Sequence, residues 1–192
     1  SFRREYPRQQ LAAHVVGYVD HAQAPATGIE RYADFYLKGQ DGWRIDELDG
    51  RNRELPQFNL RRIPRTDGYS VVLSLDLNVQ DIIEEELRRI AAQYEPKKAS
   101  IVVSDPRTGF VLGMANWPTF DPNEFNKVPK EDMARMKNVA MTDIYEPGSV
   151  FKIVAAAGAL NEGLVRADSV FDCSLTSIDY NGKVRGLPRD DH

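Results

Sequence analysis

The chain has a single cysteine, Cys173, and no apolar run long enough to cross a bilayer. One cysteine excludes an internal disulfide, and a spanning helix needs about 20 apolar residues. Basic residues do not cluster either, because 25 Lys and Arg are interspersed with 29 Asp and Glu, for a net charge of −4. Nucleic-acid-binding proteins usually show a basic patch, so we expect no nucleic-acid partner. The three histidines lack ligand spacing, and we expect no metal site.

The 192 residues are 42% hydrophobic, which suits one or two globular domains. The chain opens with SFRREYP, beginning at Ser1 rather than at a methionine. This opening resembles the middle of a longer protein. We therefore expect any membrane anchor to lie outside this chain.

Residues 1–68 are rich in Arg, Gly, Asp and Pro, with short apolar pieces between them. The stretch HVVGYVD, residues 14–20, predicts a strand. Apolar residues recur at helical spacing over residues 29–37 and predict a helix. Residues 41–55 predict a hairpin or an irregular ribbon, and the prolines that follow predict a linker ending near Gly68.

From Tyr69 the hydrophobic pattern is more regular. YSVVLSLD, residues 69–76, predicts a strand that ends at Asp76, a good N-cap for an amphipathic helix over residues 79–91. ASIVVSD and FVLGMANW, joined by a Pro- and Gly-containing turn, predict an antiparallel hairpin over residues 99–117. Their apolar runs predict strands buried on both faces. A short helix is expected over residues 130–136.

Chemistry is suggested by YEPGSVFK, in which Pro147 and Gly148 predict a sharp entry into a helix beginning near Ser149. The residues that follow, IVAAAGAL, are apolar on all sides and predict a central, buried helix. Ser149 and Lys152 lie three residues apart, so they share a helix face. A helix N-terminus also supplies free backbone N–H groups for a developing oxyanion.

A serine nucleophile needs a base, and burial lowers the pKa of a lysine so that it can accept a proton. Lys152 is therefore a candidate general base for Ser149. The simpler alternative is that Ser149 only caps the helix and that Lys152 extends to solvent. Two acids nearby, Asp143 and Glu146, could tune the lysine, but solvated loop acids are the more common case.

The surroundings of Ser149 resemble those of class B penicillin-binding proteins, the peptidoglycan D,D-transpeptidases. The Ser-x-x-Lys pair is a known motif of that superfamily. Long stretches on both sides also resemble the family, in the correct order. They are REYP, AAHVVGYV, TGIERYADFYLKGQDG, LSLDLNVQ, DPRTGFVLGMANWPTFDPNEF and KNVAMTD.

The resemblance implies an α+β fold with an irregular pedestal domain of the dimerisation type over residues 1–68. Residues 69–192 would form the first part of a helix–antiparallel sheet–helix transpeptidase domain. It implies that Ser149 attacks stem peptides and forms an acyl-enzyme, that Lys152 takes the serine proton, and that β-lactams acylate the same serine. No metal or organic cofactor is expected.

The resemblance also implies a location on the extracytoplasmic side of the cytoplasmic membrane, in the cell envelope. A membrane glycan polymerase is a possible partner through the pedestal. The role would lie in cell division or cell shape, with YEPGS and KNVAMTD favouring the division type.

One departure from the family is that the downstream Ser-x-Asn and Lys-Thr-Gly or Lys-Ser-Gly motifs do not occur in this sequence. We therefore expect an N-terminal fragment of a transpeptidase that is inactive alone, in which Lys152 is incompletely surrounded. Two alternatives stay open. The chain could be a non-catalytic interaction module, or it could be a β-lactamase or β-lactam sensor, although neither of these needs the first 68 residues.

Overall fold

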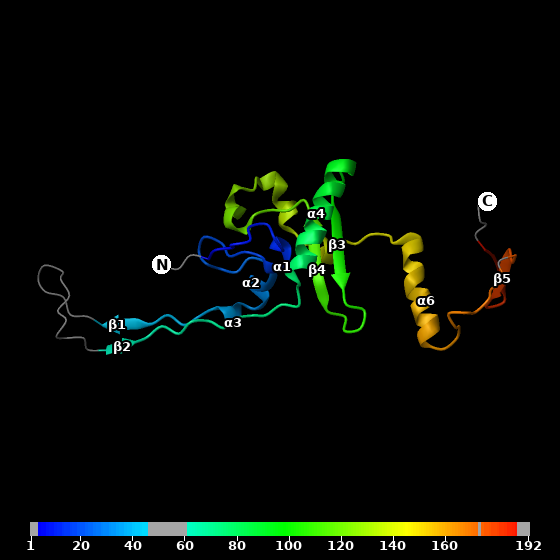
Figure 1. Cartoon of the computed structure of the whole chain (residues 1–192), viewed down its shortest axis with the longest axis horizontal. Coiled ribbons are helices and arrows are strands. Elements are labelled where there is room, and N and C mark those ends of the chain that lie inside the picture. The colour runs from blue at the N-terminus through cyan, green and yellow to red at the C-terminus, as the bar shows by residue number, and fades with distance from the viewer. Residues whose placement is uncertain (1–3, 46–60, 173, 188–192) are drawn as a thin grey trace, which may run out of the picture. The chain divides into compact units, whose positions relative to one another are not determined.

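The computed structural model describes residues 4–45, 61–172 and 174–187 (Figure 1). The chain divides into two compact units, Ser1–Asp143 and Ile144–His192. Helices and small antiparallel sheets are mixed along the chain, which confirms the predicted α+β class. No helix in the described ranges is both long and apolar enough to cross a membrane.

The first part of unit Ser1–Asp143 contains short helices and one small sheet. Its elements are α1 (Ala13–Val16), α2 (Gly28–Tyr32), α3 (Asp34–Leu37), β1 (Trp43–Ile45) and β2 (Arg61–Ile63). The predicted helix over residues 29–37 is thus confirmed, with a break at Ala33. Strands β1 and β2 pair antiparallel, as the predicted hairpin requires, while its middle, residues 46–60, lies outside the described residues.

The strand predicted over residues 14–20 is wrong, because this stretch begins in helix α1. The helix ends at Gly17, which has a φ of 80°. A Cβ at Gly17 would lie 2.0 Å from the carbonyl oxygen of Thr27, so two chain segments cross here at a distance that only glycine permits. Tertiary packing decides the outcome, since His14, the first residue of the stretch, is buried with its ring edge-on to Phe120.

The centre of the unit is α4 (Leu77–Tyr94) packed on the hairpin of β3 (Ala99–Ser104) and β4 (Val111–Trp117). As predicted, Asp76 is the N-cap of α4, and its carboxylate accepts hydrogen bonds from the N–H groups of Asn78 and Val79 at 2.8 and 3.0 Å. The buried face of α4 consists of Gln80, Ile83, Leu87 and Ala91, at the spacing of one helix face.

The β3–β4 hairpin has the predicted antiparallel register, and Gly109 in its turn has a φ of 75°. The expectation that both faces of its strands are buried is wrong for β3, where half-buried and exposed residues alternate. The sheet has two strands, and α4 covers one of its faces. A one-turn helix, α5 (Val139–Thr142), contacts both strands.

The strand predicted over residues 69–76 is also wrong, since no strand is assigned there. The Ser74 hydroxyl and the Asp76 N–H donate to the carbonyls of Val111 and Leu112, at 2.6 and 2.8 Å, so the segment touches the start of β4 without pairing along it. Val72 is 92% exposed. A β-branched sequence alone does not make a strand where no partner strand continues the ladder.

The loop after β4 contains two 3₁₀ helices, η2 (Pro122–Lys127) and η3 (Lys130–Met136). The second confirms the short helix predicted over residues 130–136. Together with Ala13 of α1, Phe120 and Met136 form a small core that joins the N-terminal segments to this loop.

Unit Ile144–His192 contains η4 (Gly148–Phe151), α6 (Lys152–Asn161) and a hairpin of β5 (Ser177–Tyr180) and β6 (Lys183–Gly186). The predicted helix after Ser149 is confirmed, but its predicted burial is wrong. No residue of α6 is buried, and Ile153 is 74% exposed. The described elements of this unit place η4 beside α6 but do not surround it.

Candidate active site at Ser149 and Lys152

The candidate nucleophile lies in a tight 3₁₀ turn that leads into α6. Pro147 precedes the turn with helical φ and ψ, and Gly148 begins it with a φ of 56°. This left-handed φ suits glycine, because it costs other residues strain. The sharp entry predicted from Pro147 and Gly148 is therefore present.

Ser149 and Lys152 lie on one side of this turn. The backbone N–H of Lys152 donates to the carbonyl oxygen of Ser149, so the two residues close a 3₁₀ turn. Side chains three residues apart nearly eclipse in a 3₁₀ helix, which brings both onto one face. Within residues 144–172 and 174–187, no hydrogen bond joins the Ser149 hydroxyl to the Lys152 ammonium.

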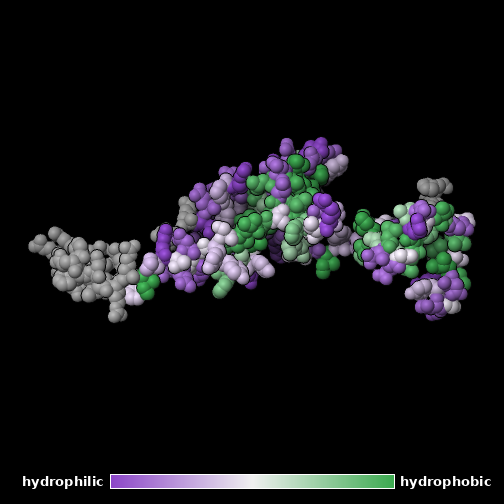
Figure 2. Space-filling view, turned by 60° about the horizontal axis from the view of Figure 1, so that its bottom comes forward, coloured by the Kyte–Doolittle hydropathy of each residue, from purple (hydrophilic) through white to green (hydrophobic). Residues whose placement is uncertain are grey.

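Both side chains are exposed in the described structure, as are their apolar neighbours Val150 and Phe151. Figure 2 shows hydrophobic residues, coloured green, at the surface of the described elements of this unit. The described residues form no apolar pocket around Lys152, in agreement with the expectation that this lysine is incompletely surrounded. The pair therefore has the spacing expected of a nucleophile and its base, without a buried environment around the lysine.

The acids before the serine have separate environments. Asp143 forms a 2.7 Å ion pair with Lys98, and this hydrogen bond holds the pKa of Asp143 below its ordinary value. Glu146 is exposed. Asp143 is therefore paired with Lys98 rather than with Lys152 in the described structure. Both acids are solvent-exposed, as expected for loop acids.

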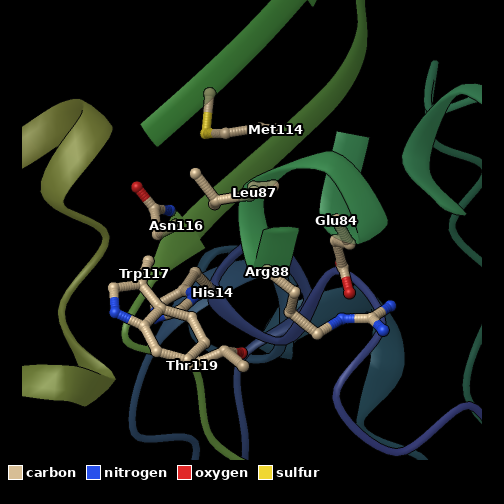
Figure 3. Close-up of a pocket in the computed structure, with 9 residues that line it drawn as sticks. His14, Glu84, Leu87, Arg88, Met114, Asn116, Trp117 and Thr119 are labelled. Carbon is tan, nitrogen blue, oxygen red and sulfur yellow. The ribbon is translucent and has the colours of Figure 1, made fainter. Parts of the chain in front are cut away.

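Two cavities are lined by described residues of unit Ser1–Asp143. One, between α1 and β4, measures about 10 Å³, room for about one water molecule (Figure 3). A second, of about 900 Å³, is open and apolar. It is lined by residues of α1, α2, β4, η3 and α5, among them Tyr32, Met114 and Met141, and by Tyr18 in the loop after α1. No group of three or more His, Cys, Asp or Glu side chains gathers as a metal site anywhere in the described ranges.

His14, which lines the small cavity, is buried and packs edge-on against Phe120 with ring centroids 5.3 Å apart. Its Nε2–H donates to the carbonyl oxygen of Arg135 at 2.8 Å. Burial lowers the pKa of His14 below its ordinary 6.5, and the nearby Arg135 charge adds to this. Glu84 and Arg88 of α4 line the other side of the cavity (Figure 3).

We expect stability to fall in mild acid because of His14. The unfolded chain takes up a proton at a pH where the folded chain does not, so stability is complete above pH 6.5 and is lost as the pH falls below it. Melting temperatures at pH 7.5 and 5.5 should differ more for the wild type than for His14→Gln, which keeps a donor but cannot titrate. His21→Gln, at an exposed position, is the control. Equal acid losses in wild type and His14→Gln would contradict this role.

Sequence reasoning missed a set of buried side-chain amides around β4. Gln80 is 1% exposed, and its amide both donates to the carbonyl and accepts from the N–H of Met114, at 3.0 and 2.8 Å. Further along β4, the side-chain amide of Asn116 donates a hydrogen bond to the side-chain oxygen of Asn138. The signal was present in LSLDLNVQ, ANW and KNVA, where polar amides interrupt otherwise apolar patterns.

Comparisons with known proteins show which family the chain resembles. The family model described as the penicillin binding protein transpeptidase domain matches residues 99–191. The model described as the penicillin binding protein A dimerisation domain matches residues 1–47. The chain belongs to the class B penicillin-binding proteins. The boundary expected near residue 68 stays a prediction.

Two curated relatives show how similar the chain is to individual proteins of this family. Peptidoglycan D,D-transpeptidase FtsI of Escherichia coli is 35% identical over 93% of this chain and 29% of its own length. Stage V sporulation protein D of Bacillus subtilis is 33% identical over 92% of the chain and 27% of its own length. The chain thus spans less than a third of these relatives.

Among solved structures, penicillin binding protein 3 of Mycobacterium tuberculosis in its apo form matches 96% of this chain and 37% of its own chain. The identity is 32% and the TM-score 0.72. The same protein has been solved in complex with aztreonam and with ampicillin.

Proposed function

We propose that the chain is the nucleophile-bearing part of a peptidoglycan D,D-transpeptidase, with Ser149 as nucleophile and Lys152 as general base. The observation that carries this proposal is the 3₁₀ turn that places both residues on one face at the start of α6. Relatives named as peptidoglycan D,D-transpeptidases that align with 93% of the chain support it.

In the proposed reaction, Lys152 takes the proton of the Ser149 hydroxyl while the serine oxygen attacks the carbonyl between the two terminal D-alanines of a stem peptide. The C–N bond breaks, and the terminal D-alanine leaves with a proton on its amine. An acyl ester remains on Ser149. An amino group of a neighbouring stem peptide then attacks the ester, forms the cross-link and returns the proton to the serine oxygen.

The Ser149 N–H is a candidate donor to the oxyanion that forms in each attack. The second donor, and the Ser-x-Asn and Lys-Thr-Gly type motifs, do not occur in the 192 residues. Lys152 is also exposed, so no described residue surrounds it as a complete site would. We therefore expect the 192 residues alone to be inactive.

β-Lactams are the proposed inhibitors, since their strained amide presents the same carbonyl to Ser149. The relative solved with aztreonam and ampicillin supports this. A place in the cell envelope, on the outer side of the cytoplasmic membrane, follows from a peptidoglycan substrate. A division role is favoured by the segments YEPGS and KNVAMTD.

Mass spectrometry of the intact protein after incubation with benzylpenicillin tests the proposal. The full-length protein that carries this chain should gain one penicillin mass, and Ser149→Ala should gain none. The 192-residue chain should stay unmodified. An adduct that persists in full-length Ser149→Ala would overturn the assignment of the nucleophile.

A second candidate function is an interaction module without acyl transfer. The dimerisation-domain match over residues 1–47 and the exposed aromatic side chains Tyr32 and Phe35 favour an interaction role for the pedestal. A membrane glycan polymerase is the proposed partner. If the full-length protein takes no penicillin label but still binds such a partner, this second function is the better account.

A further inference from the structure

The segment that precedes the Ser149 turn is held against β4 by a buried amide. Asn116 of β4 is 4% exposed. Its Nδ2 donates to Oδ1 of Asn138 at 3.0 Å, and its Oδ1 accepts from the backbone N–H of Ala140 at 3.0 Å. One side chain thus uses its donor and its acceptor on the same neighbouring segment.

Asn138 extends this contact along residues 138–143. Its Nδ2 lies 3.3 Å from the Met114 sulfur, and its carbonyl oxygen accepts from the Thr142 hydroxyl at 3.0 Å. The helix α5 that it begins has only four residues. Helices this short do not persist alone, so α5 depends on what fixes its ends.

The far end of the segment has a weaker anchor. Lys98 and Asp143 form a 2.7 Å ion pair, but both side chains are more than a third exposed. Exposed pairs contribute little because solvent screens them and both side chains lose entropy. The buried amide contacts of Asn116 are therefore the stronger hold on residues 138–143.

Asp143 is followed by Ser149 after six positions. Six residues reach about 20 Å when fully extended, so a short link of chain joins residues 138–143 to the serine. Acyl transfer is sensitive to such placement, because a misplacement of about 1 Å can cost on the order of 100-fold in rate.

We propose that Asn116 is a positioning residue for the acylation of Ser149, acting by fixing residues 138–143 to strand β4. This inference rests on the proposed function. Asn116 does not touch the substrate. Its loss leaves binding of the β-lactam unchanged and slows the covalent step.

The test compares Asn116→Ala and Asn116→Asp in the full-length protein with Asn123→Ala as the matched control. Asn123 is also an amide that holds two segments, since it bonds to the backbone N–H and carbonyl of Tyr6. An aspartate at position 116 keeps the acceptor for Ala140 and can receive a hydrogen bond from Asn138 if that amide turns over.

Two measurements are needed. Stopped-flow labelling with a fluorescent penicillin separates the dissociation constant of the initial complex from the acylation rate constant. Hydrogen exchange followed by mass spectrometry reports the order of residues 138–143. For Asn116→Ala we expect an acylation rate constant about 10- to 100-fold lower, an unchanged dissociation constant and about tenfold faster exchange. Asn116→Asp should recover to within about fivefold of wild type, and Asn123→Ala should match the wild type in both.

The inference is overturned if Asn116→Ala acylates within threefold of wild type, if only the dissociation constant changes, or if exchange of residues 138–143 stays the same. Asn116→Asp covers the case in which Asn116→Ala does not fold, since failure of the aspartate variant to acylate while it retains wild-type exchange also overturns it. Failure of the proposed function looks different, because the wild type itself would then carry no label at Ser149.

Discussion

Leu87→Ala should lower the free energy of unfolding of unit Ser1–Asp143 by about 3 to 4 kcal/mol. Leu87 is 3% exposed and packs in the core that α4 forms with the β3–β4 hairpin, next to Ile83 and Ala115. Removing its branched end deletes apolar contacts and leaves a cavity, because the sheet and the helix cannot close fully around an alanine. Urea unfolding followed by far-ultraviolet circular dichroism measures the change.

Ile82→Ala is the matched control for this experiment. Ile82 belongs to the same helix and has the same number of carbon atoms, but it is 60% exposed. We expect it to change the unfolding free energy by less than about 1 kcal/mol. If both variants lose the same amount, α4 does not pack on the hairpin through the Leu87 face.

Gln80→Leu should lower the unfolding free energy by about 3 kcal/mol, although it places an apolar residue in a core. The Gln80 amide satisfies the N–H and the carbonyl of Met114 and also donates to Glu84 at 2.8 Å. Leucine leaves the Met114 groups without these hydrogen bonds, and an unsatisfied buried polar group costs about 1 to 3 kcal/mol.

The same substitution at Gln93 controls for helix propensity and for added hydrophobicity, since Gln93 is an exposed residue of α4. Gln93→Leu should stay within about 0.5 kcal/mol of the wild type in the same urea titration. A Gln80→Leu variant as stable as the wild type would show that the bonds to Met114 contribute nothing net to folding.

The elements that sequence reasoning predicted well are those whose chemistry is local. Asp76 caps α4 through the next three residues of the chain, and Gly109 allows the tight turn between β3 and β4. Asn181 and Gly182 both have positive φ and form the turn between β5 and β6. Their dipeptide is a strong hairpin signal that could have predicted this hairpin from the sequence.

The strands expected over residues 14–20 and 69–76 failed for a different reason. Both have β-branched and apolar residues, but a strand also needs a partner in register. His14 is instead buried beside Phe120, more than 100 positions away, and Val72 is 92% exposed. No local pattern encodes such distant contacts.

The candidate site also combines features set by local sequence with features that depend on distant residues. The spacing of Ser149 and Lys152 follows from three residues of chain and was predictable. Burial of the lysine depends on residues that must cover α6, and none in the described part of the chain does so. The role of Asn116 was also out of reach, because it depends on Asn138 and Ala140 packing beside β4.

Gln80 has a further consequence for how the sheet can grow. Met114 pairs with Val102 of β3 in the antiparallel register, and its own N–H and carbonyl are taken by the Gln80 side chain. An amide that imitates a neighbouring strand at this point occupies the groups that an added strand would need. An edge blocked in this way resists unwanted β-sheet association. Lateral growth of this sheet, by further strands or in aggregation, is therefore directed to the β3 side.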